Sequence, residues 1–373
     1  MPGRCPACSH PALIATGHQG AVLQTGTWKR WKWGVALACI AALGAWIAWP
    51  SSPPRRPAGP VEVPGLHAEE VRIGSGRGLL AGTLVLPEAE APVPAVVVIA
   101  GSGPADRSGR MRGFPAYAVI ADHLARSGIA VLLLDRRGVG GSAGDWRYES
   151  IEDRADDALG ALQWLRARPE VDPARTGLLG HSQGGWVVQL AASRSREVAF
   201  VVLMAGPGER VREQIITDER NEWLRTGHSA AEAEAHVRSL DRWMALVDAV
   251  APACRALRLH TLCHVIEYDP APALRRIHVP VLALFAERDT MVPPQPNRRL
   301  IEEGLREAGN DALTVREFPG ANHQFWPAKT GARAEYGDLV PGYVPGFLDT
   351  LGEWIAAVPP VGSAGNSEAG AGS

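Results

Sequence analysis

Ser182 lies within the pattern Gly180-His181-Ser182-Gln183-Gly184, between an apolar stretch and a run with helical character. A Gly-x-Ser-x-Gly turn between a strand and a helix is typical of a nucleophile elbow, which exposes the serine hydroxyl above a sheet. The two glycines remove side chains where the chain turns sharply and the helix packs closely on the strand. Such short patterns also arise by chance, so the rest of the chain has to supply the serine's partners.

An acid and a histidine follow this serine in the order that nucleophilic catalysis on such a sheet requires. Asp289 comes just after the apolar stretch 280–285, and His323 comes just after the stretch 313–318. If both stretches are parallel strands, both residues lie at the same sheet edge as the elbow. The sequence therefore predicts a triad in which His323 is the base and Asp289 orients it. Glu287 is the alternative acid, because it is still close to the strand.

A serine nucleophile also needs two backbone N–H donors for the oxyanion that develops during attack. Gln183, the residue after the serine, is expected to supply one of them. The other is expected from the segment Gly101-Ser102-Gly103, which follows the apolar stretch 95–100. We assign this role to the N–H of Ser102, with Gly101 and Gly103 as alternatives.

Apolar stretches alternate with amphipathic stretches along most of the chain. This alternation predicts an α/β fold whose sheet is mostly parallel and doubly wound. The clearest helix is 151–168, where Ser150 and Asp153 occupy the positions of a capping box. The first two strands surround a Gly-rich turn and are expected to form an antiparallel hairpin. The predicted strands are 69–73, 79–86, 95–100, 130–134, 175–179, 198–204, 280–285 and 313–318, and further helices are predicted over 114–127, after the elbow, and over 347–358.

One long segment, 207–276, interrupts the alternation because it is charged, helix-like and without a strand pattern. In a doubly wound sheet an insertion at this point leaves from the carboxyl ends of strands, above the ligand crevice. We therefore predict an α/β core in two parts, 61–206 and 277–358, separated by a helical cap that covers the serine.

Residues 28–49 have the features of a membrane anchor or signal segment. A cluster of tryptophan and basic residues precedes an uncharged run whose length is near the minimum for crossing a bilayer. No good cleavage site follows, so we favour an uncleaved signal anchor that holds the catalytic domain in the periplasm or outside the cell. Secretion after signal cleavage is the alternative. Residues 1–27 and 359–373 are predicted to be disordered, and 50–60 to form a Pro-rich linker.

The composition excludes several classes of function. Of the 373 residues, 46% are hydrophobic, which is enough for a sizeable core, and the formal net charge is −2. A chain without an excess of positive charge has no electrostatic footprint for nucleic acid, so we expect no nucleic-acid partner. Lysine occurs only as Lys29, Lys32 and Lys329, which leaves the serine without a lysine base nearby in the sequence.

The chain has five cysteines, too few for a disulfide scaffold. Cys254 and Cys263, in the predicted cap, could pair as a disulfide if the domain lies outside the cytoplasm. They could also bind zinc together with His260 and His264, although this spacing matches no established template. We favour the disulfide, and we expect no metal and no cofactor.

Five motifs lie between residues 101 and 323, and the resemblance that they carry extends over about 69–358. They are Gly101-Ser102-Gly103-Pro104-Ala105-Asp106, Asp135-Arg136-Arg137-Gly138-Val139-Gly140-Gly141-Ser142, Gly180-His181-Ser182-Gln183-Gly184-Gly185, Glu287-Arg288-Asp289 and Asn322-His323. With them the chain resembles the α/β-hydrolase superfamily. The first two motifs are most similar to bacterial serine esterases with a Gly-Ser-Gly-Pro oxyanion loop. That subgroup is also similar to prolyl-oligopeptidase-type hydrolases and acyl-CoA thioesterases.

The resemblance implies a carboxylesterase-like serine hydrolase that works through an acyl-enzyme without metal or cofactor. A thioesterase, an acyltransferase or a small peptidase that uses the same triad is the alternative. Ala286, where these proteins often have glycine, departs mildly from the pattern and leaves Asp289 in place. Trp223 and Trp243 in the predicted cap suggest a small ester substrate with an apolar acyl or aryl group.

Overall fold

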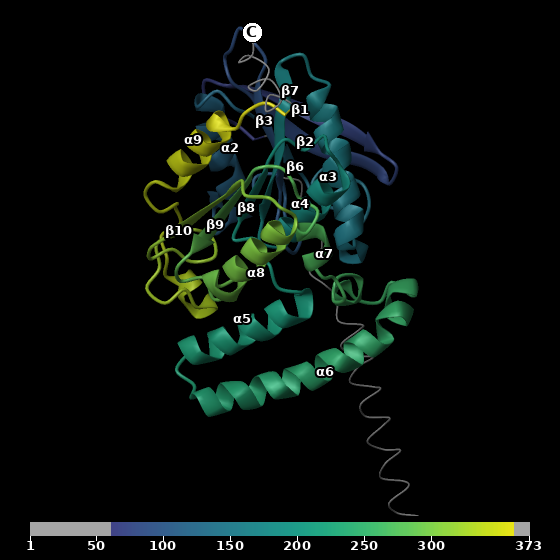
Figure 1. The fold of residues 1–373 in the computed structure, drawn as a ribbon, viewed down its shortest axis with the longest axis vertical. Helices are drawn as coiled ribbons and strands as arrows, with labels where there is room; N and C mark the ends of the chain where they lie inside the picture. Colours follow the sequence, from purple (N-terminus) through teal and green to yellow (C-terminus); the bar gives the residue numbers. More distant parts are fainter. Residues whose placement is uncertain (1–60, 362–373) are drawn as a thin grey trace, which may run out of the picture. The chain divides into compact units, whose positions relative to one another are not determined.

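A central sheet of eight strands organises residues 61–361, the part of the chain that the computed structural model describes (Figure 1). The strands are β1 (His67–Ser75), β2 (Gly78–Leu86), β3 (Val93–Ile99), β6 (Ala130–Leu134), β7 (Val171–His181), β8 (Val201–Met204), β9 (Val281–Ala286) and β10 (Leu313–Phe318). Their order across the sheet is β1-β2-β6-β3-β7-β8-β9-β10. β2 pairs antiparallel with β1 and with β6, and the pairs from β6 to β10 are parallel. The mostly parallel α/β fold predicted from the sequence is confirmed.

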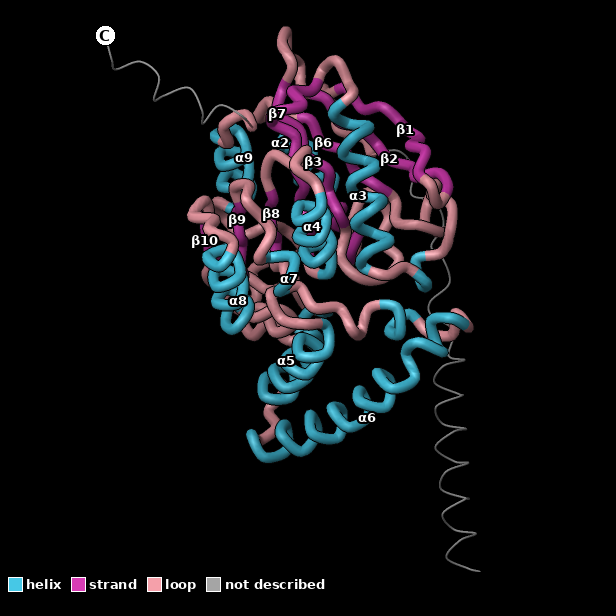
Figure 2. Tube along the Cα trace, turned by 45° about the vertical axis from the view of Figure 1, so that its right-hand side comes forward, coloured by secondary structure: helices cyan, strands magenta, loops and turns pink. Residues whose placement is uncertain are grey.

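Helices cover both faces of this sheet, as Figures 1 and 2 show. They are α2 (Ala116–Arg126), α3 (Ile151–Arg166), α4 (Gln183–Arg194), α8 (Pro294–Glu307) and α9 (Phe347–Ala357). Ile120 of α2 and Leu351 of α9 join Val96 of β3 in one apolar cluster. α3 and α4 pack against each other and on β7. Successive side chains of a strand point to opposite faces of the sheet. Because helices cover both faces, every residue of β3 is buried, and all of them are apolar apart from one proline.

Besides short 3-10 helices, the structure contains a hairpin and a longer helix that the sequence analysis does not predict. Residues Arg110–Met111 (β4) and Phe114–Pro115 (β5) form a small hairpin beside the main sheet. Because this hairpin includes Phe114, α2 begins at Ala116 rather than at the predicted residue 114. The second unpredicted element is α8, which lies against β9 and β10.

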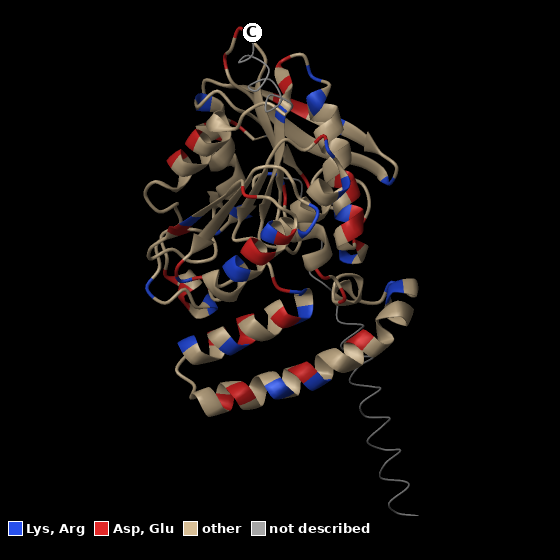
Figure 3. Cartoon of the chain, viewed as in Figure 1, with Lys and Arg blue, Asp and Glu red and all other residues tan. Residues whose placement is uncertain are grey.

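Three helices and no strand occupy residues 207–276, all of which are described. These helices are α5 (Val211–Arg225), α6 (Ala230–Ala256) and α7 (Ala271–Leu274), with a short 3-10 helix, η2 (Thr261–His264), before α7. α5 and α6 pack side by side and carry charged side chains of both signs (Figure 3). The side-chain amides of Gln214 and Asn221 on α5 donate hydrogen bonds to the carbonyls of Met291 (2.7 Å) and Thr290 (3.3 Å). These bonds hold α5 over the loop after β9.

A disulfide joins Cys254, near the end of α6, to Cys263 in η2. The favoured pairing is therefore present. The zinc alternative is wrong, because sulfurs bonded to each other are not thiolate ligands.

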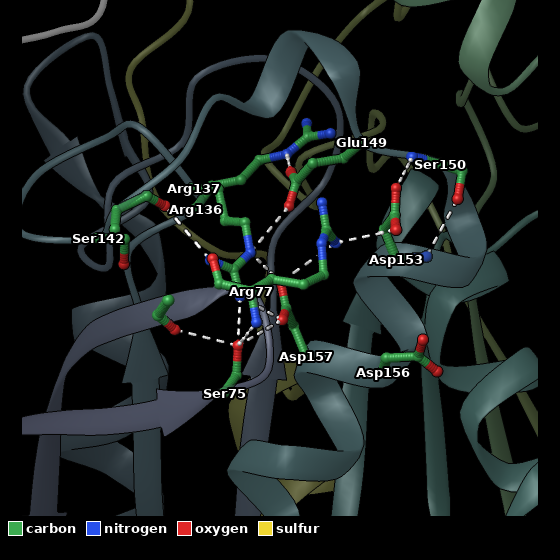
Figure 4. A network of polar contacts seen from close by, with 12 residues as sticks. Ser75, Arg77, Arg136, Arg137, Ser142, Glu149, Ser150, Asp153, Asp156 and Asp157 are labelled. Carbon is green, nitrogen blue, oxygen red and sulfur yellow. Dashed lines mark hydrogen bonds and ion pairs between the residues drawn. The ribbon is translucent and has the colours of Figure 1, made fainter. Parts of the chain in front are cut away.

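Arginine–carboxylate pairs connect α3 to the loop after β6 (Figure 4). The guanidinium of Arg137 contacts Asp157 at 2.6 Å, and that of Arg136 contacts Glu149 at 3.0 Å. Ser150 and Asp153 form the predicted capping box at the start of α3. These contacts fix the first turns of α3 beside the carboxyl ends of β3 and β6.

The predictions for residues 1–27, 28–49 and 50–60, and most of the predicted 359–373 tail, fall outside the described residues. Within residues 61–361, no helix is both long and apolar enough to cross a bilayer. At the start of that tail, Val361 donates its backbone N–H to the carbonyl of Ala174 at 2.9 Å.

Candidate active site

Ser182 lies at the turn between β7 and α4 with a positive φ of 53°. A positive φ strains a residue other than glycine by about 1–3 kcal/mol, and such strain clusters at functional sites. A Cβ on Gly180 would lie 2.2 Å from the carbonyl oxygen of Gly184, and a Cβ on Gly184 would lie 2.3 Å from that of Ile99. Both glycines are therefore required by the close approach of α4 to β7 and β3. This is the geometry of a nucleophile elbow.

His323 and Asp289 meet at the carboxyl ends of β10 and β9. His323 Nδ1 lies 2.7 Å from Asp289 Oδ2, and both side chains are buried. The other oxygen of Asp289 accepts the backbone N–H groups of Met291 and Val292 at 2.9 Å each. A carboxylate held in this way fixes the ring with its proton on Nδ1 and leaves Nε2 able to accept a proton. Glu287, the alternative acid, accepts a backbone N–H from the loop after β10 instead.

A second carboxylate, Asp218 of α5, acts on this histidine. Burial alone would lower the pKa of His323, but the charges of Asp289 and Asp218 and the hydrogen bond to Asp289 raise that pKa above its usual value. Burial also raises the pKa of Asp218 to about 6, against the opposing effect of Arg333, whose guanidinium lies 2.8 Å away. The cap therefore contributes negative charge to the environment of the base.

We expect Asp218→Asn to move the acidic limb of the pH profile of kcat/KM to lower pH. Removing the carboxylate lowers the pKa of His323, so the imidazole stays neutral, and active as a base, at more acidic pH. The profile should be measured beside that of Glu213→Gln, which neutralises an exposed carboxylate on the same helix. An unmoved limb, or one displaced to higher pH, would contradict this assignment of charge.

The two predicted oxyanion donors both lie beside Ser182. Gln183 is the first residue of α4, and Ser102 lies in the loop after β3. Within residues 61–361 neither backbone N–H has a hydrogen-bond partner. The N–H of Gly101, by contrast, donates to the hydroxyl of Tyr117 at 3.3 Å. Gly101 is one of the two alternatives to Ser102 as the second oxyanion donor, and its N–H is already engaged in this bond.

His181 contacts both Tyr117 and the backbone of His323. Its Nδ1 lies 3.0 Å from the Tyr117 hydroxyl, and its Nε2 lies 3.3 Å from the carbonyl oxygen of His323. Since a carbonyl can only accept, the proton of His181 is assigned to Nε2. Burial, together with the charge of His323, lowers the pKa of His181 to about 3 and keeps it neutral. His181 therefore positions the His323 backbone and is not a second base.

A pocket of about 490 Å³ opens above Ser182 and His323. Arg110 and Arg112 from the β4–β5 hairpin lie in its wall, and both side chains are exposed. Trp223, expected to favour apolar substrates, instead stacks on His236 with ring centroids 4.2 Å apart. The residues lining the pocket are Gly101, Ser102, Pro104, Ala105, Asp106, Gly109, Arg110, Met111, Arg112, Ala116, Tyr117, His181, Ser182, Met291, His323 and Gln324.

Tyr117 and Asp218 are among the residues of this site that the sequence analysis does not identify. Tyr117 lies on the buried stripe of α2 with Ile120 and Leu124, and a tyrosine hydroxyl on such a stripe signals a buried hydrogen-bond partner. Asp218 gave no signal, because it is one of many charges on a polar helix. Only the packing of α5 over the loop after β9 reveals its role.

Comparison with known proteins agrees with this fold. The family model described as Serine aminopeptidase, S33, matches residues 93–327. Esterase EstD of Thermotoga maritima is 26% identical over 244 residues, which cover 65% of this chain and 57% of EstD. An esterase of Pyrococcus furiosus superposes with a TM-score of 0.51 at 18% identity, covering 73% of this chain and 90% of that one. The α/β hydrolase GrgF of Penicillium gives 0.51 at 19% identity, covering 79% and 99%.

These findings confirm the superfamily that the five motifs indicate. The match spans just over half of EstD, and the two solved structures share the fold at low identity. The family model covers well over half of the chain, including the elbow, Asp289 and His323. The chain therefore belongs to the α/β-hydrolase superfamily, in the family described as Serine aminopeptidase, S33.

Proposed function

We propose that this protein is a serine hydrolase that cleaves carboxylic esters through an acyl-enzyme. The observation that carries the proposal is the placement of Ser182 in a strained elbow, in the same pocket as a histidine held by a buried carboxylate at 2.7 Å. The similarity to EstD, an esterase by name, supports the ester as substrate.

The geometry supports a two-step mechanism. His323 Nε2 removes the proton of Ser182 as its oxygen attacks the acyl carbon, while Asp289 stabilises the imidazolium that forms. The N–H groups of Gln183 and Ser102 hold the oxyanion. His323 then protonates the leaving alcohol, and water activated by the same base releases the acid. The Ser182 hydroxyl makes no hydrogen bond within residues 61–361, and we expect its alignment with Nε2 to tighten when substrate binds.

Hydrolysis of p-nitrophenyl esters from acetate to palmitate by the full chain tests the proposal. Labelling with a fluorophosphonate, followed by peptide mapping, should be measured in parallel. Ester turnover with the label on Ser182 is the expected result. A label on Ser182 without ester turnover would redirect the search to thioesters, acyl transfer or peptides, and a failure to label Ser182 would refute the nucleophile itself.

The charges in the pocket wall predict a preference for anionic esters. Asp106 is the one carboxylate among the described lining residues, and its Oδ1 is engaged by the hydroxyl of Ser108 at 2.5 Å. Two arginines, Arg110 and Arg112, against this one carboxylate leave the described lining with a net positive charge. We expect p-nitrophenyl hydrogen glutarate to exceed p-nitrophenyl valerate in kcat/KM by about two- to fivefold, the size expected for exposed charges.

Arg110→Gln should reduce this ratio, and added salt should do the same. The matched control is Arg126→Gln, because Arg126 is outside the pocket lining. Equal use of the two esters at low salt would contradict the predicted preference.

A further inference from the structure

The guanidinium of Arg154 contacts the backbone of the oxyanion loop, the segment Gly101–Gly103 that carries the predicted donor Ser102. Arg154 is in the first turns of α3, and its residue is only 5% exposed. Its Nη1 donates to the side-chain oxygen of Gln183 at 2.6 Å, and its Nη2 donates to the carbonyl of Ala100 at 2.5 Å and approaches that of Gly101 at 3.4 Å. One side chain thus contacts both segments that carry the predicted oxyanion donors.

Arg154 differs from the other buried arginines near it. Each of those forms an ion pair with a carboxylate: Arg107 with Asp135, Arg136 with Glu149, and Arg137 with Asp157. Within residues 61–361, Arg154 makes no hydrogen bond to a carboxylate, and it donates only to neutral amide oxygens. Burial, with the nearby charge of Arg136, lowers the pKa of Arg154 to about 9, so it remains charged at neutral pH.

A buried cation without a bonded carboxylate is costly, and glutamine or methionine would fill the same space without that cost. Glu149 and Asp157 act on this charge through space without a hydrogen bond to it, so the guanidinium can still stabilise a further anion. The acyl-oxyanion is such a species, because it exists only while the reaction proceeds.

The peptide between Gly101 and Ser102 connects the cation to the pocket. Among the described residues the one cis peptide is Gln295–Pro296, so this peptide is trans. In a trans peptide the C=O and the N–H point in opposite directions. Since the carbonyl of Gly101 faces Arg154, the N–H of Ser102 faces away from it, and Ser102 lines the pocket. A cation on the carbonyl also polarises the peptide and strengthens the N–H as a donor.

We propose that Arg154 is a positioning residue for the oxyanion hole: it orients the Gly101–Ser102 peptide and the side chain of Gln183, the first residue of α4, and its charge strengthens the N–H of Ser102 as a donor. The inference rests on the proposed function, because it requires a reaction that develops an oxyanion. Arg154 touches no substrate; it acts through Ser102 and Gln183.

The test compares Arg154→Gln with Arg137→Gln in the full chain. Both variants lose a buried guanidinium, but Arg137 makes no contact with the oxyanion loop. For p-nitrophenyl butyrate we expect Arg154→Gln to lower kcat by about 10- to 100-fold, up to the loss of one oxyanion donor, with KM changed less than about threefold. The affinity for a trifluoromethyl ketone should fall in parallel. Arg154→Lys keeps the charge but loses the planar guanidinium, so its kcat should lie between that of Arg154→Gln and that of the unsubstituted chain.

The labelling rate with a fluorophosphonate separates the possible failures. No labelling of the unsubstituted chain at Ser182 refutes the proposed function. Normal labelling of that chain, with kcat and ketone affinity unchanged in Arg154→Gln, overturns the role of Arg154 alone. So does a loss of kcat that Arg137→Gln reproduces in full. If Arg154→Gln does not fold, kcat is compared between Arg154→Lys and the unsubstituted chain. An unchanged kcat in Arg154→Lys then overturns the inference.

Discussion

Replacing Ser182 with alanine is expected to lower kcat for ester hydrolysis by at least about 10⁴-fold. Alanine has no hydroxyl to form the acyl-enzyme, so water would have to attack directly and only the oxyanion donors would still assist it. The rate should be measured with p-nitrophenyl butyrate under saturating conditions. The rapid release of p-nitrophenol that marks acylation should disappear as well.

Ser193→Ala is the matched control. It makes the same substitution on α4, where the hydroxyl of Ser193 donates only to the carbonyl of Leu190 at 2.8 Å and lies outside the pocket lining. This variant should keep the full rate. Ester hydrolysis by Ser182→Ala at the original rate would show that another group is the nucleophile.

Gly184→Ala is expected to destabilise the fold and to disturb the site together. The new Cβ would lie 2.3 Å from the carbonyl oxygen of Ile99 and 2.8 Å from that of Ala100. Both contacts are with backbone atoms, which cannot move aside by a change of rotamer as a side chain can. The helix α4 must therefore shift away from β3. We expect a loss of about 1–3 kcal/mol in the free energy of unfolding. Since a 1 Å displacement of catalytic groups can cost about 100-fold, kcat should fall by about that factor.

Gly160→Ala provides the comparison for this substitution. Gly160 is in the interior of α3, and a Cβ there would meet nothing within 4 Å. Alanine should raise the free energy of unfolding by about 0.5–1 kcal/mol, because glycine gives the unfolded chain extra freedom. Urea unfolding of both variants measures the difference, and equal stability of the two would contradict the steric account of Gly184.

The elbow and its partners were predictable because their signals are local. Strand, turn and helix follow one another around Ser182, and Gly180 is explained by a contact within the motif, although Gly184 is required by the approach of β3. Asp289 follows the apolar strand β9 and His323 follows β10, each within a few residues, and parallel strands bring their carboxyl ends to one edge. The structure brings these two side chains together, and their catalytic role stays a prediction until the variants are measured.

Other parts of the fold depend on contacts between distant segments. The sequence analysis missed α8, although its amphipathic pattern is clear, with Ile301 and Leu305 buried; its first residues include Pro294 and Pro296, which do not signal a helix. Arg154 did leave a signal, since it stands on the apolar stripe of α3 between Ile151 and Ala158. A charge on such a stripe indicates a buried partner, but only the structure identifies that partner as the oxyanion loop.

The bond between Cys254 and Cys263 makes the end of the cap sensitive to redox conditions. It closes a short loop, with a sequence separation of 9 residues, for which the loss of chain entropy contributes about 2–3 kcal/mol. That contribution exists only where thiols are oxidised, as in the periplasm or outside the cell. Cys263 lies in η2, and η2 packs against the 3-10 helix η1 (Trp146–Tyr148), which comes just before the capping box of α3. A reducing compartment would thus loosen the cap next to the helix that carries Arg154.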